Sequence, residues 1–515
     1  MAHESTTAHS SPMLDEGQHA LSPVVGQLRA GTLFLLAYYA FFLVSKLVGF
    51  MPGYSLDDYA IVRAAGDNSL AGFFISQGRY GSALMDVILH ACNLTMSSFS
   101  TIGLAATAVF SGLFFRDALD LPPKGTATIA IGLGALLGAH PYYTEYVSYR
   151  QAALPMSLTF LGMWLALRLY RGALGAGTVR VSYLIASVLV ATLVMGFNQL
   201  AVCFLSIAVL CVHVRHLQHG LPPGLGLGFL RRQDWLAPPV HAAVAGIVLI
   251  LCNMLVAKLV LVTAGVPATG RSELIPVELL TQRWIELTHL VTVLWAQSET
   301  VAAWPAKALA AAGFIVLLVA RLGTAKGSAW LAVVVLIAAT VAALIPIAVT
   351  VTWWPVPRTL IAVPFALAAA VSVLIPTSNP RVTLAGILLI TSGCIFSAHS
   401  QSILFNQQRL NRWDQMQARE MALLATEKYP EAASKLAIVG PTWSHEIAQS
   451  IAQGDMNISA LGVDWALDPL FDEATGRDQN VRLAPEFSGL CSTSAKYPAP
   501  SSLHKQGDEV VICMH

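Results

Sequence analysis

Apolar residues occur in runs of about twenty positions along most of the chain, separated by short polar stretches. A helix needs about twenty residues to cross a hydrocarbon layer of about 30 Å, so each run is long enough to span a membrane. We therefore expect an all-α polytopic membrane protein. The runs predict about eleven transmembrane helices, near residues 30–50, 95–115, 125–141, 149–168, 182–197, 199–216, 240–262, 302–320, 329–350, 358–376 and 382–399.

The polar segments predict the other parts of the molecule. Residues 1–29 are polar and lack the basic segment and cleavage site of a signal peptide, which predicts a loose cytoplasmic tail ahead of a transmembrane domain at 30–400. Two stretches in the outer loops, 70–93 and 275–295, are too apolar for water and too polar to span, so we expect helices lying in the membrane interface. The long outer loops themselves fall at 51–94, 142–148 and 263–301.

Residues 401–515 change in character. A polar helical stretch leads into a strand-like segment at 436–440, then into loops rich in Gly, Pro and Asp, and finally into a strand-like segment at 509–514. This order predicts a small water-soluble α/β domain at the C-terminus.

Composition agrees with a membrane environment. The chain is 55% hydrophobic and only 11% charged, whereas soluble domains carry about 25% charged residues. Membrane lipids are therefore its main surroundings. The net charge of +1 offers no basic field, so we expect no nucleic-acid partner.

Basic residues are distributed unequally between the loops. Twelve Lys and Arg residues fall in the tail and the even-numbered connections, against six in the opposite loops before residue 401. Because cytoplasmic loops are enriched in basic residues, we expect a cytoplasmic N-terminus and a C-terminal domain outside the cytoplasm. In that oxidising compartment Cys491 and Cys513 would form a disulfide, although two separate thiols are the alternative.

The first outer loop contains two adjacent acids, Asp57 and Asp58. A carboxylate at the bilayer edge, partly desolvated and near a hydroxyl, can accept the hydroxyl proton as its oxygen attacks. The alternative is local structure, because Ser55 followed by Asp58 resembles a capping box. The same loop holds Arg79 between glycines, where it would bind a phosphate or carboxylate, or simply extend its charged end toward the head groups.

Aromatic and polar residues gather in two further outer segments. Residues 140–151 combine four tyrosines with His140, Glu145, Arg150 and Gln151, and a sugar-binding cleft uses such residues because pyranose faces stack on rings. An aromatic belt at the membrane interface is the alternative. The candidate sugar or acceptor contacts are His140, Tyr143, Glu145, Gln151, Asn198, Gln199 and Trp354.

Two of these segments have alternatives of their own. Asn198 and Gln199 occupy a short outer turn, where the amides would bind ligand hydroxyls or satisfy the turn itself. Trp354 lies in a proline-braced segment that ends at Arg358, a candidate for a lipid phosphate. Simple extension of Arg358 toward the head groups is the alternative there.

Several motifs of other enzyme classes are missing from the sequence. It contains no Walker-type phosphate loop, no HExxH, no GxSxG and no C-x-x-C pair. Two adjacent carboxylates alone hold Mg²⁺ or Ca²⁺ poorly, so we expect neither a metal nor another cofactor.

These residues also carry a family resemblance. Asp57-Asp58, Gly78-Arg79-Tyr80 and the run HPYYTEYVSYRQAALP at 140–155 resemble the Gtr-type O-antigen, serotype-converting glucosyltransferases of the GT-C class. The resemblance covers about residues 30–400. It implies a bacterial inner-membrane enzyme that modifies lipopolysaccharide from the periplasmic side, with undecaprenyl phosphate glucose as donor and lipid-linked O-antigen as acceptor.

The resemblance also implies roles for particular residues. Asp57 or Asp58 would be the base, and Arg79, Arg150 and Arg358 would bind the donor phosphate. The leaving polyprenyl phosphate is a stable anion that needs charge stabilisation more than a proton, which favours a single inverting displacement. A flippase or transporter of a lipid-linked saccharide is the alternative function, and a scaffold subunit is a third; transporters, however, usually place ionisable residues near the midplane.

Overall fold

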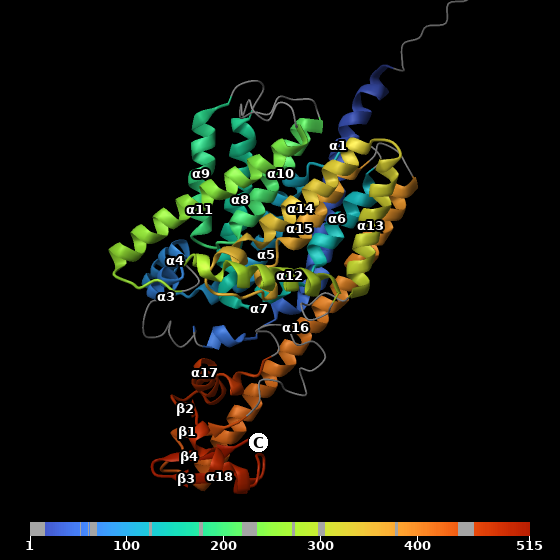
Figure 1. Cartoon of the computed structure of the whole chain (residues 1–515). Coiled ribbons are helices and arrows are strands. Elements are labelled where there is room, and N and C mark those ends of the chain that lie inside the picture. The colour runs from blue at the N-terminus through green and yellow to red at the C-terminus, as the bar shows by residue number, and fades with distance from the viewer. Residues whose placement is uncertain are drawn as a thin grey trace, which may run out of the picture.

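The computed structural model describes residues 16–51, 53–59, 61, 70–122, 126–174, 179–218, 234–269, 273–296, 304–375, 380–440 and 458–514. Most of these residues are helical, and the long helices run together as a bundle (Figure 1). A small domain with a β-sheet lies beyond one end of the bundle, and we call this end the sheet-side end.

Apolar helices form the bundle. Among the described residues, eight helices are long and apolar enough to cross a membrane. They are α1 (Glu16–Lys46), α5 (Ser100–Leu119), α8 (Ala153–Ala173), α10 (Ala201–Gln218), α11 (Ala237–Ala264), α13 (Trp304–Leu322), α14 (Lys326–Val349) and α16 (Pro380–Lys428). The chain is therefore a multi-pass membrane protein.

Three shorter apolar helices lie among the long ones: α6 (Ala127–Ala139), α9 (Val181–Met195) and α15 (Val363–Leu374). Together with the eight, they coincide with the eleven expected spans. That all eleven cross the bilayer stays a prediction, because these three are shorter than a full span.

Glycines allow α6 to pack closely against two long helices. Helix α6 packs against both α1 and α16. A side chain at Gly138 would meet the carbonyl oxygen of Tyr38 at 2.5 Å, and one at Gly386 would meet the backbone of Thr128 at 2.7 Å. Only glycine allows these backbones to approach so closely. Small residues at such contacts are typical of helices packed within a membrane, where the hydrophobic effect does not drive helices together.

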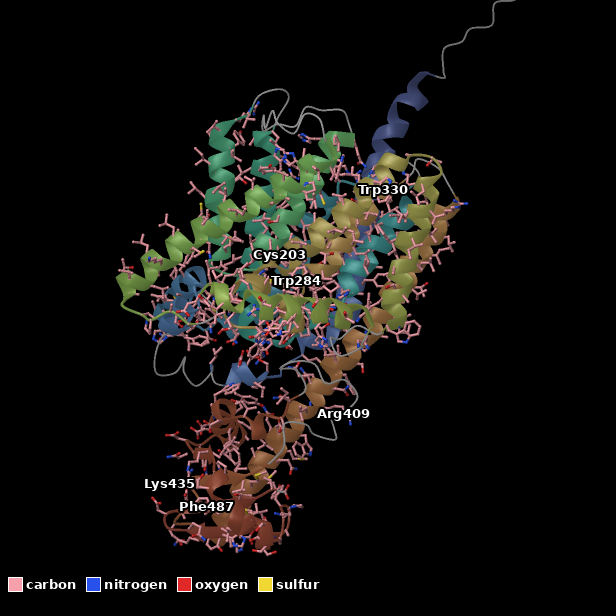
Figure 2. All side chains as sticks on the ribbon, in the orientation of Figure 1. Cys203, Trp284, Trp330, Arg409, Lys435 and Phe487 are labelled. Carbon is pink, nitrogen blue, oxygen red and sulfur yellow. A yellow bond between two sulfur atoms is a disulfide. The ribbon has the colours of Figure 1, made fainter. Side chains whose placement is uncertain are left out.

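Tryptophans mark two levels on the outside of the bundle. Trp284 and Trp330 are 69% and 68% exposed, and they belong to different helices (Figure 2). Trp304 opens α13 and is also exposed, as is Trp235 just before α11. Exposed tryptophans at the ends of apolar helices are typical of the two membrane interfaces.

Short helices cover the sheet-side end, in the segments where the sequence predicted interfacial helices and outer loops. They are α3 (Ala71–Ser76), α4 (Tyr80–Ala91), α7 (Tyr142–Ser148) and α12 (Leu280–Ala296). Helix α12 lies crosswise to the long helices (Figure 1). Arg283 anchors it, because this buried guanidinium donates to the carbonyls of Thr350 and Val351 at 3.0 and 3.1 Å.

The C-terminal domain begins inside a helix. Helix α16 has 49 residues and continues without a break from the bundle into the small domain, so the expected boundary at 401 falls within it. The sheet has the strand order β2-β1-β4-β3, with β1 parallel to β2 and β4, and β3 antiparallel to β4. The strands are β1 (Lys435–Val439), β2 (Asn480–Leu483), β3 (Leu503–Gln506) and β4 (Glu509–Cys513).

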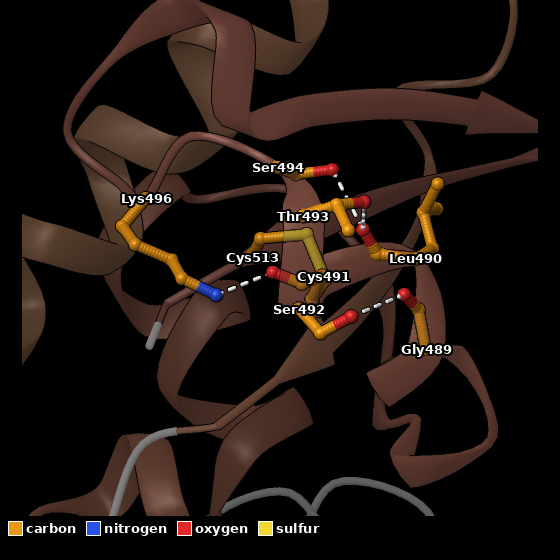
Figure 3. Close-up of a disulfide and its surroundings, with 8 residues drawn as sticks. All are labelled: Gly489, Leu490, Cys491, Ser492, Thr493, Ser494, Lys496 and Cys513. Carbon is orange, nitrogen blue, oxygen red and sulfur yellow. Dashed lines mark hydrogen bonds between the residues drawn. A yellow bond between two sulfur atoms is a disulfide. The ribbon is translucent and has the colours of Figure 1, made fainter.

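Helices cover both faces of this sheet. Val510 and Ile512 point toward α16 and α17 (Asp464–Thr475), whereas Val511 and Cys513 point toward α18 (Ser488–Thr493). A disulfide joins Cys491 on α18 to Cys513 on β4, as the sequence predicted, with a Cα–Cα distance of 5.3 Å (Figure 3). The expected α/β domain is therefore present, with two more strands than the sequence indicated.

The N-terminal tail differs from the expectation. We expected a loose segment over residues 1–29, but α1 begins at Glu16 and continues unbroken into the first apolar run. The prediction was wrong there because residues 16–29 contain both apolar and charged positions, so hydropathy alone missed the helix. Residues 1–15 and parts of the loops at 51–94 and 263–301 lie outside the described residues.

Candidate functional site

Residues 53–59 of the first outer loop, which we call the acidic loop, carry Asp57 and Asp58 on a helical turn at 56–59. The capping box between Ser55 and Asp58 is present: the Asp58 carboxylate accepts the Ser55 N–H at 3.0 Å, and the Asp58 N–H points back to the Ser55 hydroxyl at 3.4 Å. The Ser55 hydroxyl also donates to the Asp58 carboxylate at 2.8 Å. Local structure therefore explains part of what Asp58 does.

Asp58 also ties the first outer loop to the second. Its carboxylate accepts the backbone N–H groups of Arg150 and Gln151 at 3.2 and 3.4 Å, across more than ninety residues of sequence. These two amides open the 3₁₀ turn Arg150–Ala152, so an acid here satisfies donors that the turn leaves unpaired. The two expected site loops are thus in direct contact.

Burial distinguishes the two acids. Asp58 is fully buried, and burial raises the pKa of its carboxyl to about 6, although its hydrogen bonds oppose the rise. Asp57 is only partly buried. Because a base must reach the proton that it removes, Asp57 is the better placed of the pair, and Asp58 holds the loop in position.

Arg150 joins the acidic loop to the second outer loop through its side chain as well. Its guanidinium lies over the ring of Tyr54, 5.2 Å from the centroid. Arg150, Tyr54 and Ser148 line a depression that encloses about 310 Å³ of space, open solvent included. Gln407, Gln408 and Asn411 of α16 form its other wall. The depression therefore combines an arginine, a tyrosine and three amides at the edge of the acidic loop.

A second group of polar residues surrounds the Tyr146 hydroxyl on α7. The Asn198 amide donates to this hydroxyl at 3.0 Å. Burial raises the pKa of the Tyr146 hydroxyl, while the positive charges of Arg79 and Arg358 act in the opposite direction. Asn198 from the short turn between α9 and α10 thus contacts this phenol, and Arg79 and Arg358 lie near enough for their charges to act on it.

Arg358 is engaged by Glu145. Its Nη1 donates to the buried Glu145 carboxylate at 2.6 Å, and its backbone N–H donates to the other oxygen of that carboxylate, also at 2.6 Å. The same Nη1 donates to the Tyr149 hydroxyl at 2.7 Å, and the guanidinium lies over the Tyr149 ring at 4.9 Å. Glu145 is therefore the counter-ion of Arg358. This pairing changes the expected role of Glu145 as a sugar contact, because its carboxylate is buried, and that of Arg358 as a phosphate ligand, because its guanidinium already has an anionic partner.

Arg79 is held where two turns meet. It precedes α4, and the next residues dock on the turn between α9 and α10 through N–H groups of Gly81 and Ser82 that donate to the Gly196 carbonyl at 2.9 and 3.3 Å. Gln199 donates to the Gln77 carbonyl at 2.9 Å across the same contact. Gln199 therefore connects two loops, which favours the structural reading of this amide.

Two predicted sugar contacts are core residues. His140 packs against the rings of Tyr142 and Phe396, each with centroids 4.6 Å away, and is 7% exposed. Tyr143 is 4% exposed and meets the ring of Phe115 edge-on at 6.4 Å. Aromatic character alone cannot separate a binding residue from a core residue, so both leave the set of candidate contacts. Trp354 remains partly buried, and its carbonyl accepts from the Thr359 hydroxyl at 3.0 Å.

Sequence reasoning missed several residues that matter here. Tyr54, Tyr59 and Tyr146 organise the site, and Asn411 and Asp414 of α16 border it. Amides recurring on α16 beyond residue 401 were the available indication, because a polar helix face next to a membrane span needs a partner.

The described residues contain no group of three or more His, Cys, Asp or Glu side chains able to hold a metal ion. In comparisons with known proteins, no family model matches this chain and no curated protein matches it.

Proposed function

We propose that this chain is a membrane glycosyltransferase that moves a hexose from a polyprenyl-phosphate donor to a lipid-linked glycan. The observation that carries the proposal is the junction of the acidic loop with the second outer loop, where Asp58 accepts from Arg150 and Gln151. Asp57, which is only partly buried, directly precedes Asp58 and so lies beside a junction that also carries the Arg150 guanidinium and the Tyr54 ring. Glycosyl transfer to a hydroxyl from a phosphate donor needs such a pairing of base and cation.

The reaction would be a single displacement. An acceptor hydroxyl oxygen attacks the anomeric carbon of the donor sugar and forms the new glycosidic bond, while its proton passes to the Asp57 carboxylate. The bond between the anomeric carbon and the phosphate oxygen breaks, and polyprenyl phosphate leaves with the electron pair. The configuration at the anomeric carbon is inverted because attack and departure occur on opposite faces.

Arg79 and Arg150 are the arginines proposed to stabilise the leaving phosphate. Arg358 would contribute mainly by positioning α7, because its guanidinium is already bonded to Glu145. This division revises the roles that the resemblance implied, in which all three arginines bind phosphate alike.

A lipid-linked donor agrees with the surface beside Arg79. Helix α4 begins directly after Arg79 and exposes Leu84 and Ile88 by 59% and 55%. An apolar surface adjoining a cationic residue suits a molecule with a long hydrocarbon tail and a phosphate head.

Glucose as the sugar, O-antigen as the acceptor and a bacterial inner membrane as the location belong to this proposal through the family resemblance alone. A cytoplasmic N-terminus and a periplasmic site rest on the excess of basic residues in the even-numbered connections.

The test uses purified protein in lipid nanodiscs with labelled polyprenyl-phosphate hexoses and a lipid-linked glycan. Asp57→Asn should lower the rate of transfer by about 10²–10⁴-fold, the usual contribution of a general base. Asp464→Asn is the control, because Asp464 is an exposed acid on the small domain. Transfer at the normal rate by Asp57→Asn would remove it as the base, and binding of donor without transfer would favour the flippase.

A further inference from the structure

The acidic loop is inserted into the core of the C-terminal domain. Leu56 and Tyr59 are 6% and 2% exposed, and both belong to one buried cluster with residues of that domain. The cluster includes Met421 on α16, Phe471 on α17 and Ile512 on β4. A segment that lies more than 350 residues before its hydrogen-bond partner Asn411 on α16 thus completes the hydrophobic core of the small domain.

Polar contacts reinforce this insertion. The Tyr59 hydroxyl accepts from the side-chain amides of Asn411 and Gln415, both on α16. Burial and the negative charge of Glu473 on α17 raise the pKa of the Tyr54 hydroxyl, and the rings of Tyr54 and Tyr59 lie 5.0 Å apart. Burial of Tyr59 therefore leaves its hydroxyl group with partners on α16.

The loop is held from two sides. On a helical turn, positions 56 and 59 lie on one face, which here faces the C-terminal domain. Asp58 points instead toward the bundle, where it accepts from Arg150 and Gln151. Asp57 occupies the remaining, partly exposed side. The orientation of Asp57 is therefore determined by the C-terminal domain on one side of the acidic loop and by the helical bundle on the other.

We infer that the C-terminal domain is a positioning element for the acidic loop and sets the direction of the Asp57 carboxylate. Leu56 and Tyr59 are the positioning residues, and neither needs to touch a substrate. The catalytic consequence rests on the proposed function, whereas the seating of the loop does not. If the seat is loosened, Asp57 moves relative to Arg150, and a displacement of about 1 Å in such a site costs about 10²-fold in rate.

Hydrogen–deuterium exchange on the full chain in nanodiscs tests the seating without any assay of activity. In Leu56→Ala, peptides covering 53–59 and 150–151 should exchange at least about tenfold faster, because the Arg150 and Gln151 amides donate to Asp58. Leu423→Ala is the matched control, since Leu423 is 62% exposed on α16. Unchanged exchange at 53–59 would overturn the inference.

Tyr59→Phe provides a milder variant that keeps the buried ring and removes only the hydroxyl acceptor. We expect the same peptides to exchange faster, by a smaller factor than in Leu56→Ala. This variant keeps the inference testable if Leu56→Ala fails to fold. Unchanged exchange in Tyr59→Phe, together with unfolding of Leu56→Ala, would overturn it, because the polar contacts to α16 would then not hold the loop.

Steady-state kinetics then separate the two proposals. If wild type transfers sugar, Leu56→Ala should lower kcat by about 10²-fold while the KM for the donor changes little, since misplacing Asp57 affects the transition state. Faster exchange with an unchanged kcat would overturn the positioning role and leave the transferase proposal standing. Absence of transfer by wild type would refute the transferase proposal, and the exchange result would still decide the seating.

Discussion

The pair formed by Glu145 and Arg358 gives the sharpest test of the structure. Glu145 is fully buried, and Arg358 is 16% exposed in its side chain. Three variants form a cycle: Glu145→Gln, Arg358→Met and the double variant. Each replacement keeps roughly the shape of the original side chain and removes its charge.

The expected costs are unequal because the two charges have different access to water. Removing one partner of a buried ion pair costs about 3–5 kcal/mol, since the other charge is left without compensation. Glu145→Gln should fall at the low end, near about 3 kcal/mol, because the amide oxygen can still accept the Arg358 backbone N–H and the stranded guanidinium can reach solvent. Arg358→Met should cost about 4–5 kcal/mol, because it strands a fully buried carboxylate.

Unfolding of the purified protein in one detergent, followed by a probe that does not depend on activity, measures the cycle. The double variant should cost less than the sum of the singles by at least about 2 kcal/mol, because it leaves no stranded charge. Arg409→Met is the control, since Arg409 is exposed on α16 (Figure 2) and should change stability by less than about 0.5 kcal/mol. Costs that add within about 0.5 kcal/mol would refute the ion pair as a clamp.

Three further predictions follow from the structure. The double variant Cys491→Ala, Cys513→Ala should lower the free energy of unfolding of the C-terminal domain by about 3 kcal/mol, as expected from the 22-residue separation of the two cysteines, and proteolysis in denaturant measures this change. Reductant should lower the stability of wild type and leave the variant unchanged. Equal stability of the two proteins without reductant would refute the prediction. Burial raises the pKa of Asp58 from 3.8 to about 6, so the folded protein retains a proton that the unfolded chain releases, and this carboxyl should lower stability as pH rises from about 4 to about 6. Burial also raises the pKa of Asp414 to about 7, so Asp58→Asn should make the fall between about pH 4 and about pH 6 smaller without abolishing it, and parallel stability curves for variant and wild type would contradict this. Gly138→Ala should lower stability by about 1–3 kcal/mol in thermal unfolding, because the added methyl group meets a carbonyl of α1. Gly327→Ala is the control and should be close to neutral, since a methyl group there meets nothing within 4 Å. Equal effects of the two variants would refute the packing of α6.

The sequence predicted those features that depend on neighbouring residues. Apolar run length located the eleven apolar helices found among the described residues, because the thickness of a bilayer sets a minimum length that can be read along the chain. The capping box of Ser55 and Asp58 was visible as a spacing of three. Local sequence patterns predicted helix boundaries less well at α1, where a stretch of apolar and charged residues precedes the apolar run within one helix. They also missed that α16 continues as one helix from the bundle into the C-terminal domain.

Tertiary structure alone decided the composition of the candidate site. His140 and Glu145 belong to the same outer segment and looked alike as binding residues, yet one packs in the core and the other neutralises Arg358. Asp57 and Asp58 are adjacent and chemically identical, yet Asp58 is fully buried and accepts hydrogen bonds from the second outer loop, whereas Asp57 is only partly buried. Burial, pairing and access to water depend on groups that are distant in sequence and are brought together by packing, so no local pattern of residues could have assigned them.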